Sequence, residues 1–242
     1  MIKDGWVMAK NNALIKALRK ELAAVANPKK APAMQAYMKS EMPYLGVSAV
    51  PLRKVCKEVF GGCQYKDSAD WRKDVLEIWR GAKYREERHC AIELTAIRQC
   101  TGFQRMDALP MYEEMVVTGA WWDYVDSIAG HRLNQILRNE PAKMKRVMLV
   151  WSRCGNTWKR RSAILCQLKM KQETDLAFLY ACIEPSISSP EFFLRKAIGW
   201  ALRQYAWTDP DEVGRYVAEN ENRLSGLSKR EALKNILKNK TR

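Results

Sequence analysis

The chain has 242 residues, of which 47% are hydrophobic and 29% are charged. This balance is typical of a folded protein and excludes a disordered chain. With 42 Lys and Arg against 27 Asp and Glu, the formal net charge is +15. A positive field of this size favours a polyanionic partner.

The predicted elements are helices from one end of the chain to the other. The apolar stripe of residues 14–25 predicts the first long helix, and nine prolines mark starts and breaks of later ones. Period-2 alternation bounded by hairpin turns is missing, so no sheet is expected. We expect residues 1–242 to form a single domain, with residues 1–12 as a peripheral N-terminal extension.

Four segments resemble one another, and each ends on an isoleucine. They are Cys90–Ile92, Asp126–Ile128, Ser162–Ile164 and Lys196–Ile198. The isoleucines are separated by 36, 36 and 34 residues, and each lies in an amphipathic helix that follows another helix. Two helices per repeat of this length predict an α-solenoid. We therefore expect an all-α fold of about six HEAT-like repeats that form a curved, basic concave surface.

The repeat allows positions in different helices to be compared. Stepping about 100° per residue from each isoleucine places four residues on one arc of roughly 140°, away from the core. They are Trp122, Asp126, Arg161 and Trp200. Because equivalent helices of a solenoid line the same surface, these side chains are expected to converge on one ligand. Trp121 falls close to the core direction and is expected to be a core residue.

Each of these residues also has a structural interpretation. Tryptophans in helices are often core residues, and Asp126 could be a surface acid or a local salt-bridge partner. Arg161 ends the basic run 159–161, which could be a solvated face of the helix or a phosphate-binding site. Trp200 follows Gly199, a residue that is unfavourable inside a helix unless another element approaches closely. The sequence alone leaves these alternatives open.

Two further features indicate phosphate binding and helix capping. Ser228, followed by Lys229 and Arg230, resembles a capped helix start that would offer backbone amides and cations to phosphate. Asp123 is expected to act as a helix cap or a first-turn acid.

The seven cysteines do not indicate disulfides or a metal site. Their number is odd, no C-x-x-C pair occurs, and the chain has only two histidines. We predict reduced thiols and no metal. No apolar run approaches the roughly 20 residues that a membrane span needs, and residues 1–11 lack the apolar centre of a signal peptide. An intracellular protein that contacts no membrane is expected.

Several segments taken together resemble the alkylpurine DNA glycosylases of the AlkD family, which are built from HEAT-like repeats. The segments are Tyr37–Lys39, Trp121–Ile128, Trp158–Lys171, Phe192–Ala206 and Leu227–Ala232. The W-W-D-x-V-D-S-I and K-A-I-G-W motifs carry most of the resemblance, which runs in order over nearly the whole chain.

The resemblance implies a monofunctional DNA glycosylase that excises cationic N3- and N7-alkylated purines from duplex DNA. It implies no lyase activity, no cofactor and no deep base flipping, unlike most base-excision enzymes. The enzyme would act as a monomer, in the cytoplasm (nucleoid) of a bacterium or in the nucleus of a eukaryote.

The same resemblance assigns roles to individual residues. The catalytic acid corresponds to Asp126, and the two aromatic walls of the site correspond to Trp122 and Trp200. Arg161 corresponds to a DNA-contacting arginine that also helps to keep the acid ionised, and Tyr37 corresponds to a DNA-contacting tyrosine. Lys229 and Arg230 are expected to bind DNA phosphates.

Two alternatives and one departure from the family remain. Tyr124 stands where many relatives have a small residue, and it is expected to alter packing or groove contacts while leaving the acid intact. The chain could instead be a non-catalytic DNA-binding module, although a silent relative would have no chemical need for Asp126. It could also be a HEAT-like scaffold for protein partners, an interpretation that the net charge disfavours.

Overall fold

The computed structural model describes the backbone of residues 3–240 and the side chains of residues 13–236. All secondary structure in this part of the chain is helical, which confirms the predicted all-α class. Two compact units are distinguished, Met1–Phe103 and Gln104–Arg242. Residues 1–2 and the side chains of residues 3–12 lie outside the described residues, so the predicted peripheral extension at residues 1–12 stays a prediction.

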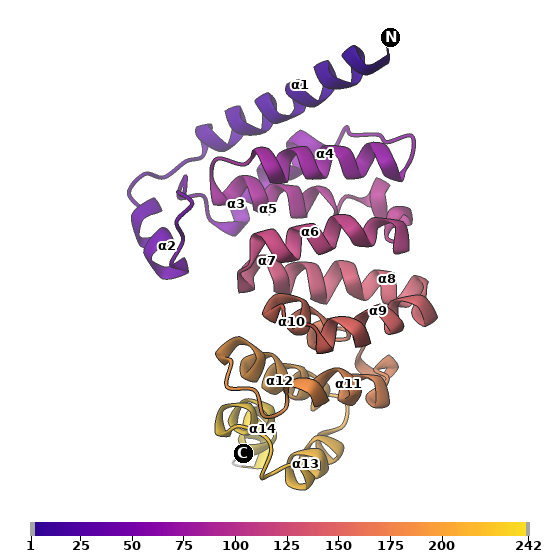
Figure 1. Cartoon of the computed structure of the whole chain (residues 1–242). Helices are drawn as coiled ribbons and strands as arrows, with labels where there is room; N and C mark the ends of the chain where they lie inside the picture. The colour runs from indigo at the N-terminus through magenta and orange to yellow at the C-terminus, as the bar shows by residue number, and fades with distance from the viewer. Residues whose placement is uncertain (1–2, 241–242) are drawn as a thin grey trace. The chain divides into compact units, whose positions relative to one another are not determined.

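The first unit is built on the packing of four helices. Its elements are α1 (Lys3–Ala24), α2 (Ala31–Met38), α3 (Ala49–Phe60), α4 (Ser68–Gly81), α5 (Arg85–Leu94) and the 3-10 helix η1 (Arg98–Phe103). Helix α3 packs on α1 and α5, and α4 lies beside α5 (Figure 1). Trp71 and Trp79 of α4 are almost fully buried and supply much of this unit's core. Asp67 caps α4 by accepting hydrogen bonds from the amides of its first turn.

A buried carboxylate fixes the segment between α2 and α3. Glu86 of α5 is 1% exposed and accepts hydrogen bonds from the backbone N–H groups of Leu45, Gly46 and Val47. Gly46 has φ of 80°, a left-handed conformation that glycine adopts without steric cost. A buried charge is tolerated here because three amides satisfy it.

The second unit contains the remaining helices. They are η2 (Met106–Ala108), α6 (Leu109–Gly119), α7 (Trp122–Ser127), η3 (Ile128–Leu133), α8 (Asn134–Asn139), α9 (Pro141–Arg153), α10 (Thr157–Leu165), η4 (Lys171–Glu173), α11 (Leu176–Ile183), η5 (Glu184–Ser186), α12 (Phe192–Tyr205), α13 (Pro210–Glu219) and α14 (Gly226–Lys240). The segment η3 is π-helical and joins α7 to α8 without a break in the chain direction (Figure 1).

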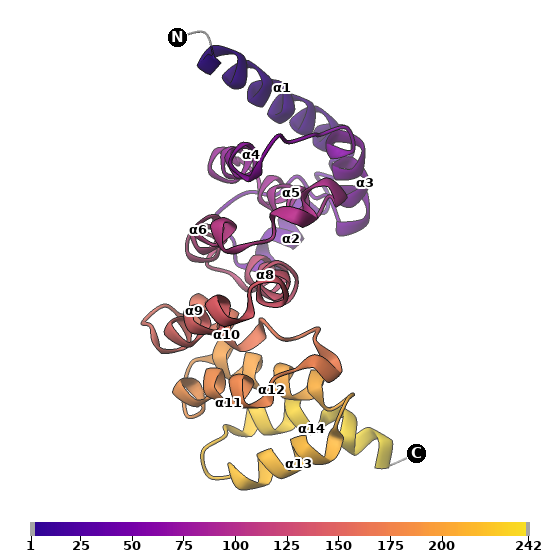
Figure 2. The same ribbon diagram turned by 90° about the vertical axis from the view of Figure 1, so that its right-hand side faces the viewer.

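The helices of the second unit follow one another in pairs, α6 with α7–α8, α9 with α10, α11 with α12, and α13 with α14. The second helices of these pairs contact each other in order. Helix α7 packs on α10 (Figure 1), and α10 packs on α12 and α12 on α14 (Figure 2). The isoleucines used to define the repeat are all buried, with exposures of 0–3%. The predicted helical repeat is therefore confirmed, because hydrophobic burial of one face sets the period.

The structure also bears on the predictions for the cysteines and for membrane spans. All seven cysteines are free thiols, and five of them are buried, which agrees with the predicted reduced state. Burial raises the pKa of the Cys100 and Cys182 thiols to about 12, so both are poor nucleophiles. Within the described residues, no helix combines the length and the apolar character needed to cross a membrane.

Candidate functional site

Asp126 and Arg161 form a bidentate ion pair in the second unit. Arg161 Nε donates to Asp126 Oδ1 and Arg161 Nη2 donates to Asp126 Oδ2, both at 2.7 Å. The arginine side chain is 5% exposed and the aspartate side chain 14% exposed. The carboxylate therefore keeps a small opening to solvent while its partner is sealed inside the protein.

Three helices build this pair. Asp126 lies near the end of α7, and Arg161 lies in α10, one repeat later in the chain. Asn156 sets the start of α10, because its side chain accepts hydrogen bonds from the first-turn amides. Arg161 Nη1 also donates to the carbonyl oxygen of Phe193 in α12, at 2.5 Å. With donors pointing at both neighbouring helices, the guanidinium is locked in a single orientation.

The surroundings of Asp126 have opposing effects on the pKa of its carboxyl. Burial raises the pKa of this carboxyl above its usual value, and the neighbouring charge of Asp123 adds to the increase. The hydrogen bonds and the charge of Arg161 lower the pKa and offset part of that effect. The result is a desolvated carboxyl whose raised pKa is held down in part by one arginine.

An aromatic cluster lies beside the pair. The rings of Trp121, Trp158 and Phe193 contact one another, with centroid separations of 6.0, 5.4 and 4.9 Å. Trp121 precedes α7 with an extended backbone and is only partly buried, so the prediction that it is a core residue is wrong. The helical wheel does not apply to a residue outside the helix. The cluster includes the residue whose carbonyl holds Arg161, and it was not predicted.

Trp122 and Trp200 lie on two of the three helices that hold the pair. Trp122 is the first residue of α7, one turn before Asp126, and Trp200 lies in the middle of α12. Both are partly exposed. Neither indole makes a ring contact or hydrogen bond with any residue that the structure describes. Two tryptophans with uncommitted rings thus lie on the helices that hold a buried acid.

Gly199 brings α12 and α14 together next to Trp200. A Cβ atom at Gly199 would lie 2.5 Å from Glu231 Cβ and 2.8 Å from the carbonyl oxygen of Ser228. No larger residue fits without moving α14, which explains a glycine inside a helix. This close approach agrees with the interpretation of the sequence.

The comparison with known sequences now bears on this geometry. Residues 18–236 match the family described as DNA alkylation repair enzyme. The chain belongs to this family. A solved structure described as a predicted DNA alkylation repair enzyme from Enterococcus faecalis is similar, with a TM-score of 0.78 and 27% sequence identity. The similarity covers 86% of this chain and 95% of that one. No curated protein sequence matches the chain.

Within this DNA alkylation repair family member, the basic run at the start of α10 is not a solvated face. Lys159 pairs with Glu113, and Arg160 donates to Ser186 and to the carbonyl oxygen of Pro185. These cations stabilise contacts with other helices. The contact of Arg161 with DNA stays a prediction, since its three donor nitrogens already bond within the protein.

The C-terminal basic pair is only partly as predicted. Ser228 is fully buried and its hydroxyl donates to the carbonyl oxygen of Arg195, so it does not cap a helix. The side chain of Ser225 accepts from the Ser228 amide instead, just before α14 begins. Lys229 is partly exposed and contacts the carbonyl oxygen of Glu221, whereas Arg230 is exposed. Binding of DNA phosphate by Lys229 and Arg230 stays a prediction.

The remaining sequence-predicted residues are Tyr37 and Tyr124. Tyr37, in α2 of the first unit, is 76% exposed, and its contact with DNA stays a prediction. Tyr124 is fully buried in α7, so its side chain serves packing rather than a groove contact. Within the described residues, no group of three or more His, Cys, Asp or Glu side chains is arranged to hold a metal ion.

Proposed function

We propose that this protein is a monofunctional DNA glycosylase, which hydrolyses the N-glycosidic bond of cationic N3- and N7-alkylated purines in duplex DNA. The observation that carries the proposal is the desolvated Asp126 carboxylate, held in a bidentate fork by Arg161. Its setting is a chain of net charge +15 that belongs to a DNA alkylation repair family. The protein would act as a monomer inside the cell, where the substrate DNA is located.

The leaving group explains why so few residues are needed. Alkylation at N3 or N7 gives the purine a positive charge, so the electron pair of the breaking C1′–N bond neutralises the base as it departs. No acid is required to protonate the leaving base. The sugar is the group that needs stabilisation, because it becomes an oxocarbenium-like cation.

Asp126 supplies the charge that this cation requires. A carboxylate in a partly desolvated position stabilises a nearby cation more strongly than one in water. It also accepts a hydrogen bond from a water molecule that attacks C1′, which completes hydrolysis with release of one proton. Because no lysine amine attacks the sugar, the DNA strand stays intact.

Trp122 and Trp200 would form the aromatic walls of the site. Indole faces carry negative electrostatic potential and attract cations at close range. Neither ring makes an aromatic contact or a hydrogen bond with a described residue, and the exposed parts of both are available to the sugar and the alkylated base. Contact with the sugar on the duplex surface requires no deep base pocket.

The test is base release from a duplex oligonucleotide that carries one N7-methylguanine. Alkaline treatment converts each abasic product to a strand break, and an untreated sample reports any lyase activity. We expect release by the wild type, no break without alkali, and loss of release in Asp126→Asn with DNA affinity retained. Asp123→Asn makes the same chemical change on the same helix and should keep activity.

A wild type that binds DNA but releases neither N7-methylguanine nor N3-methyladenine would favour a non-catalytic DNA-binding module. Equal loss of activity in Asp123→Asn and Asp126→Asn would show that the paired carboxylate of Asp126 has no special role in the reaction.

A further inference from the structure

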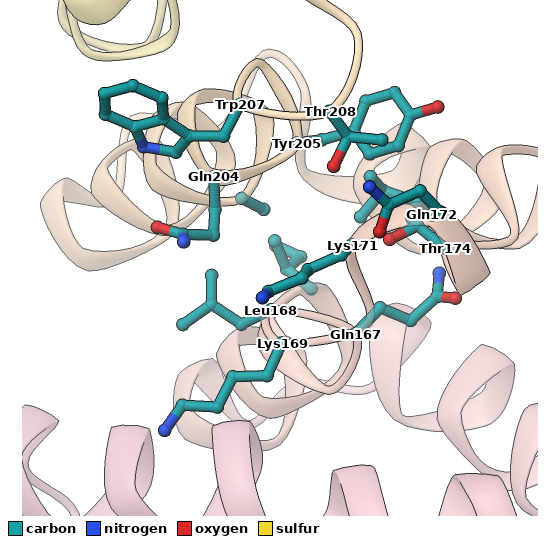
Figure 3. A pocket seen from close by; sticks show the side chains of 13 residues that line it. Gln167, Leu168, Lys169, Lys171, Gln172, Thr174, Gln204, Tyr205, Trp207 and Thr208 are labelled. Carbon is teal, nitrogen blue, oxygen red and sulfur yellow. The ribbon is translucent and has the colours of Figure 1, made fainter.

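A cavity of about 650 Å³ in the second unit has no role in the proposed reaction. It lies between the end of α10, the turn η4 and the end of α12 (Figure 3). Its aliphatic lining comes from Ile164, Leu168, Leu179 and Ala201, and polar and aromatic side chains supply the rest. None of the residues that line it is Asp or Glu.

A lysine reaches into this cavity from a strained backbone position. Lys171 has φ of 52°, which a non-glycine residue adopts at an energetic cost. Its side chain extends into the space that the amide of Gln204 also faces (Figure 3). Lys171 is exposed and forms no ion pair with any described residue. The ammonium group is therefore available to an anion.

The acids nearest in sequence are neutralised elsewhere. Glu173 pairs with Arg138, and Asp175 pairs with Lys145. Lys169, the other lysine of the lining, contacts the ring of His131 at 2.8 Å instead of a carboxylate. Beyond the other end of the lining, Asp209 caps α13 by accepting a hydrogen bond from the Glu212 amide, and Glu212 pairs with Arg215. Neither lysine of the lining therefore forms an ion pair with a described carboxylate.

Trp207 lies at the rim of the cavity and is 66% exposed (Figure 3). Tryptophan is highly buried on average, so an indole this exposed beside a cationic cavity is uncommon. Bases stack on such rings in many proteins that bind single-stranded nucleic acid, and cations on the same surface hold the phosphates. The amide of Gln204 adds a donor and an acceptor for a base edge.

We propose that this cavity binds one nucleotide, with its phosphate at Lys171 and its base against Trp207. Placement on α12 favours a nucleotide of the DNA substrate, an inference that rests on the proposed function. Trp200 and Gln204 are four residues apart and share one helix face, about 6 Å along the axis. A DNA strand advances about 3.4 Å per nucleotide, so roughly two steps separate the two positions. A free nucleotide has the same chemistry and is the other source.

The experiment compares three ligands that contain 2-aminopurine, a fluorescent base. They are a fully paired duplex, the same duplex with 2-aminopurine as a single unpaired nucleotide, and the free deoxynucleoside 5′-monophosphate. Stacking on Trp207 should quench the fluorescence of the unpaired base and raise affinity about five- to hundredfold over the paired duplex. Trp207→Ala and Lys171→Gln should abolish both effects.

Matched controls come from α9, where Lys143 and Val150 are exposed and do not line the cavity. Lys143→Gln removes one charge and Val150→Ala truncates one exposed apolar side chain. Both controls should keep the preference for the unpaired nucleotide. Lys171→Gln should bind the paired duplex about as well as Lys143→Gln, because each loses one charge.

The outcomes separate the two sources and the two proposals. Preference for the unpaired nucleotide, lost in Trp207→Ala, identifies DNA as the source. Binding of the monophosphate alone, lost in the same variant, identifies a free nucleotide. Absence of both effects overturns the nucleotide site, and base release by the same preparation would leave the glycosylase standing. Nucleotide binding without base release would instead count against the glycosylase alone.

Discussion

Removal of Arg161 should reveal how strongly the candidate site depends on one ion pair. Arg161→Met keeps the unbranched apolar stem of the side chain but leaves the Asp126 carboxylate and the Phe193 carbonyl without their donors. Three charge-assisted hydrogen bonds are lost, and two of them join charged side chains that are 5% and 14% exposed. Breaking a buried pair by removing one partner costs about 3–5 kcal/mol. That is a large share of the roughly 5–15 kcal/mol by which proteins are stable.

A double-mutant cycle isolates the pairwise part of this cost. The free energy of unfolding is measured by urea denaturation at pH 7.5 for the wild type, Arg161→Met, Asp126→Asn and the double variant. Asp126→Asn alone leaves the guanidinium buried with a neutral partner. We expect the double variant to lose about 2–3 kcal/mol less than the sum of the single variants.

A coupling energy below about 1 kcal/mol would refute this reasoning, because that value is typical of exposed ion pairs. Arg161→Lys provides a second check. A lysine cannot form the two parallel hydrogen bonds, so it should recover only part of the lost stability.

Four further predictions concern the pH dependence of Asp126, the contact at Gly199 and the salt dependence of DNA binding. As pH falls, base release should be lost when Asp126 is protonated, and because burial raises the pKa of Asp126 this loss should occur at a higher pH than for an ordinary aspartate. Arg161→Met should shift the loss to a still higher pH. The rate of base release measured against pH tests both expectations. The free energy of unfolding should depend on pH in the opposite direction. The stabilising contribution of Asp126 is present below the ordinary aspartate pKa and is lost as pH rises through the raised pKa. Urea denaturation at several pH values would show this slope, and Asp126→Asn should remove it. Gly199→Ala should cost about 1–3 kcal/mol in thermal unfolding, because its Cβ would meet Glu231 Cβ at 2.5 Å; an unchanged melting temperature would mean that α14 moves freely. Affinity for duplex DNA should fall about a thousandfold between roughly 50 and 200 mM salt if about six phosphates are contacted, and a flat response would exclude a phosphate-dominated surface.

The repeat and its buried face could be predicted because burial imposes a period on the sequence. Ile128, Ile164 and Ile198 lie at nearly constant spacing, and each is fully buried. Gly199 was also informative, since a residue that weakens a helix is retained where helices approach closely. Periodicity and residue size are local properties, and local properties are visible in a sequence.

Pairings between repeats could not be predicted in the same way. Arg161 reaches Asp126 across 35 residues because α7 and α10 stack at a particular distance and rotation. Ser228 reads as a helix cap from its neighbours, yet packing against α12 buries it and turns its hydroxyl to Arg195. The helical wheel fails at Trp121, which precedes the helix. Each of these outcomes depends on how one helix sits on another.

The energetics of the Asp126–Arg161 pair argue for chemistry rather than architecture. A buried ion pair can often be replaced by apolar side chains of similar size with no loss of stability, so packing alone does not require one. Asp126 also keeps 14% of its side-chain exposure while Arg161 keeps 5%, so the acid and not the base meets solvent. A pair selected only to hold α7 against α10 would have no need for that opening. The proposed chemistry does need it, because an acid that stabilises a cation and binds a water molecule must be reachable from solvent.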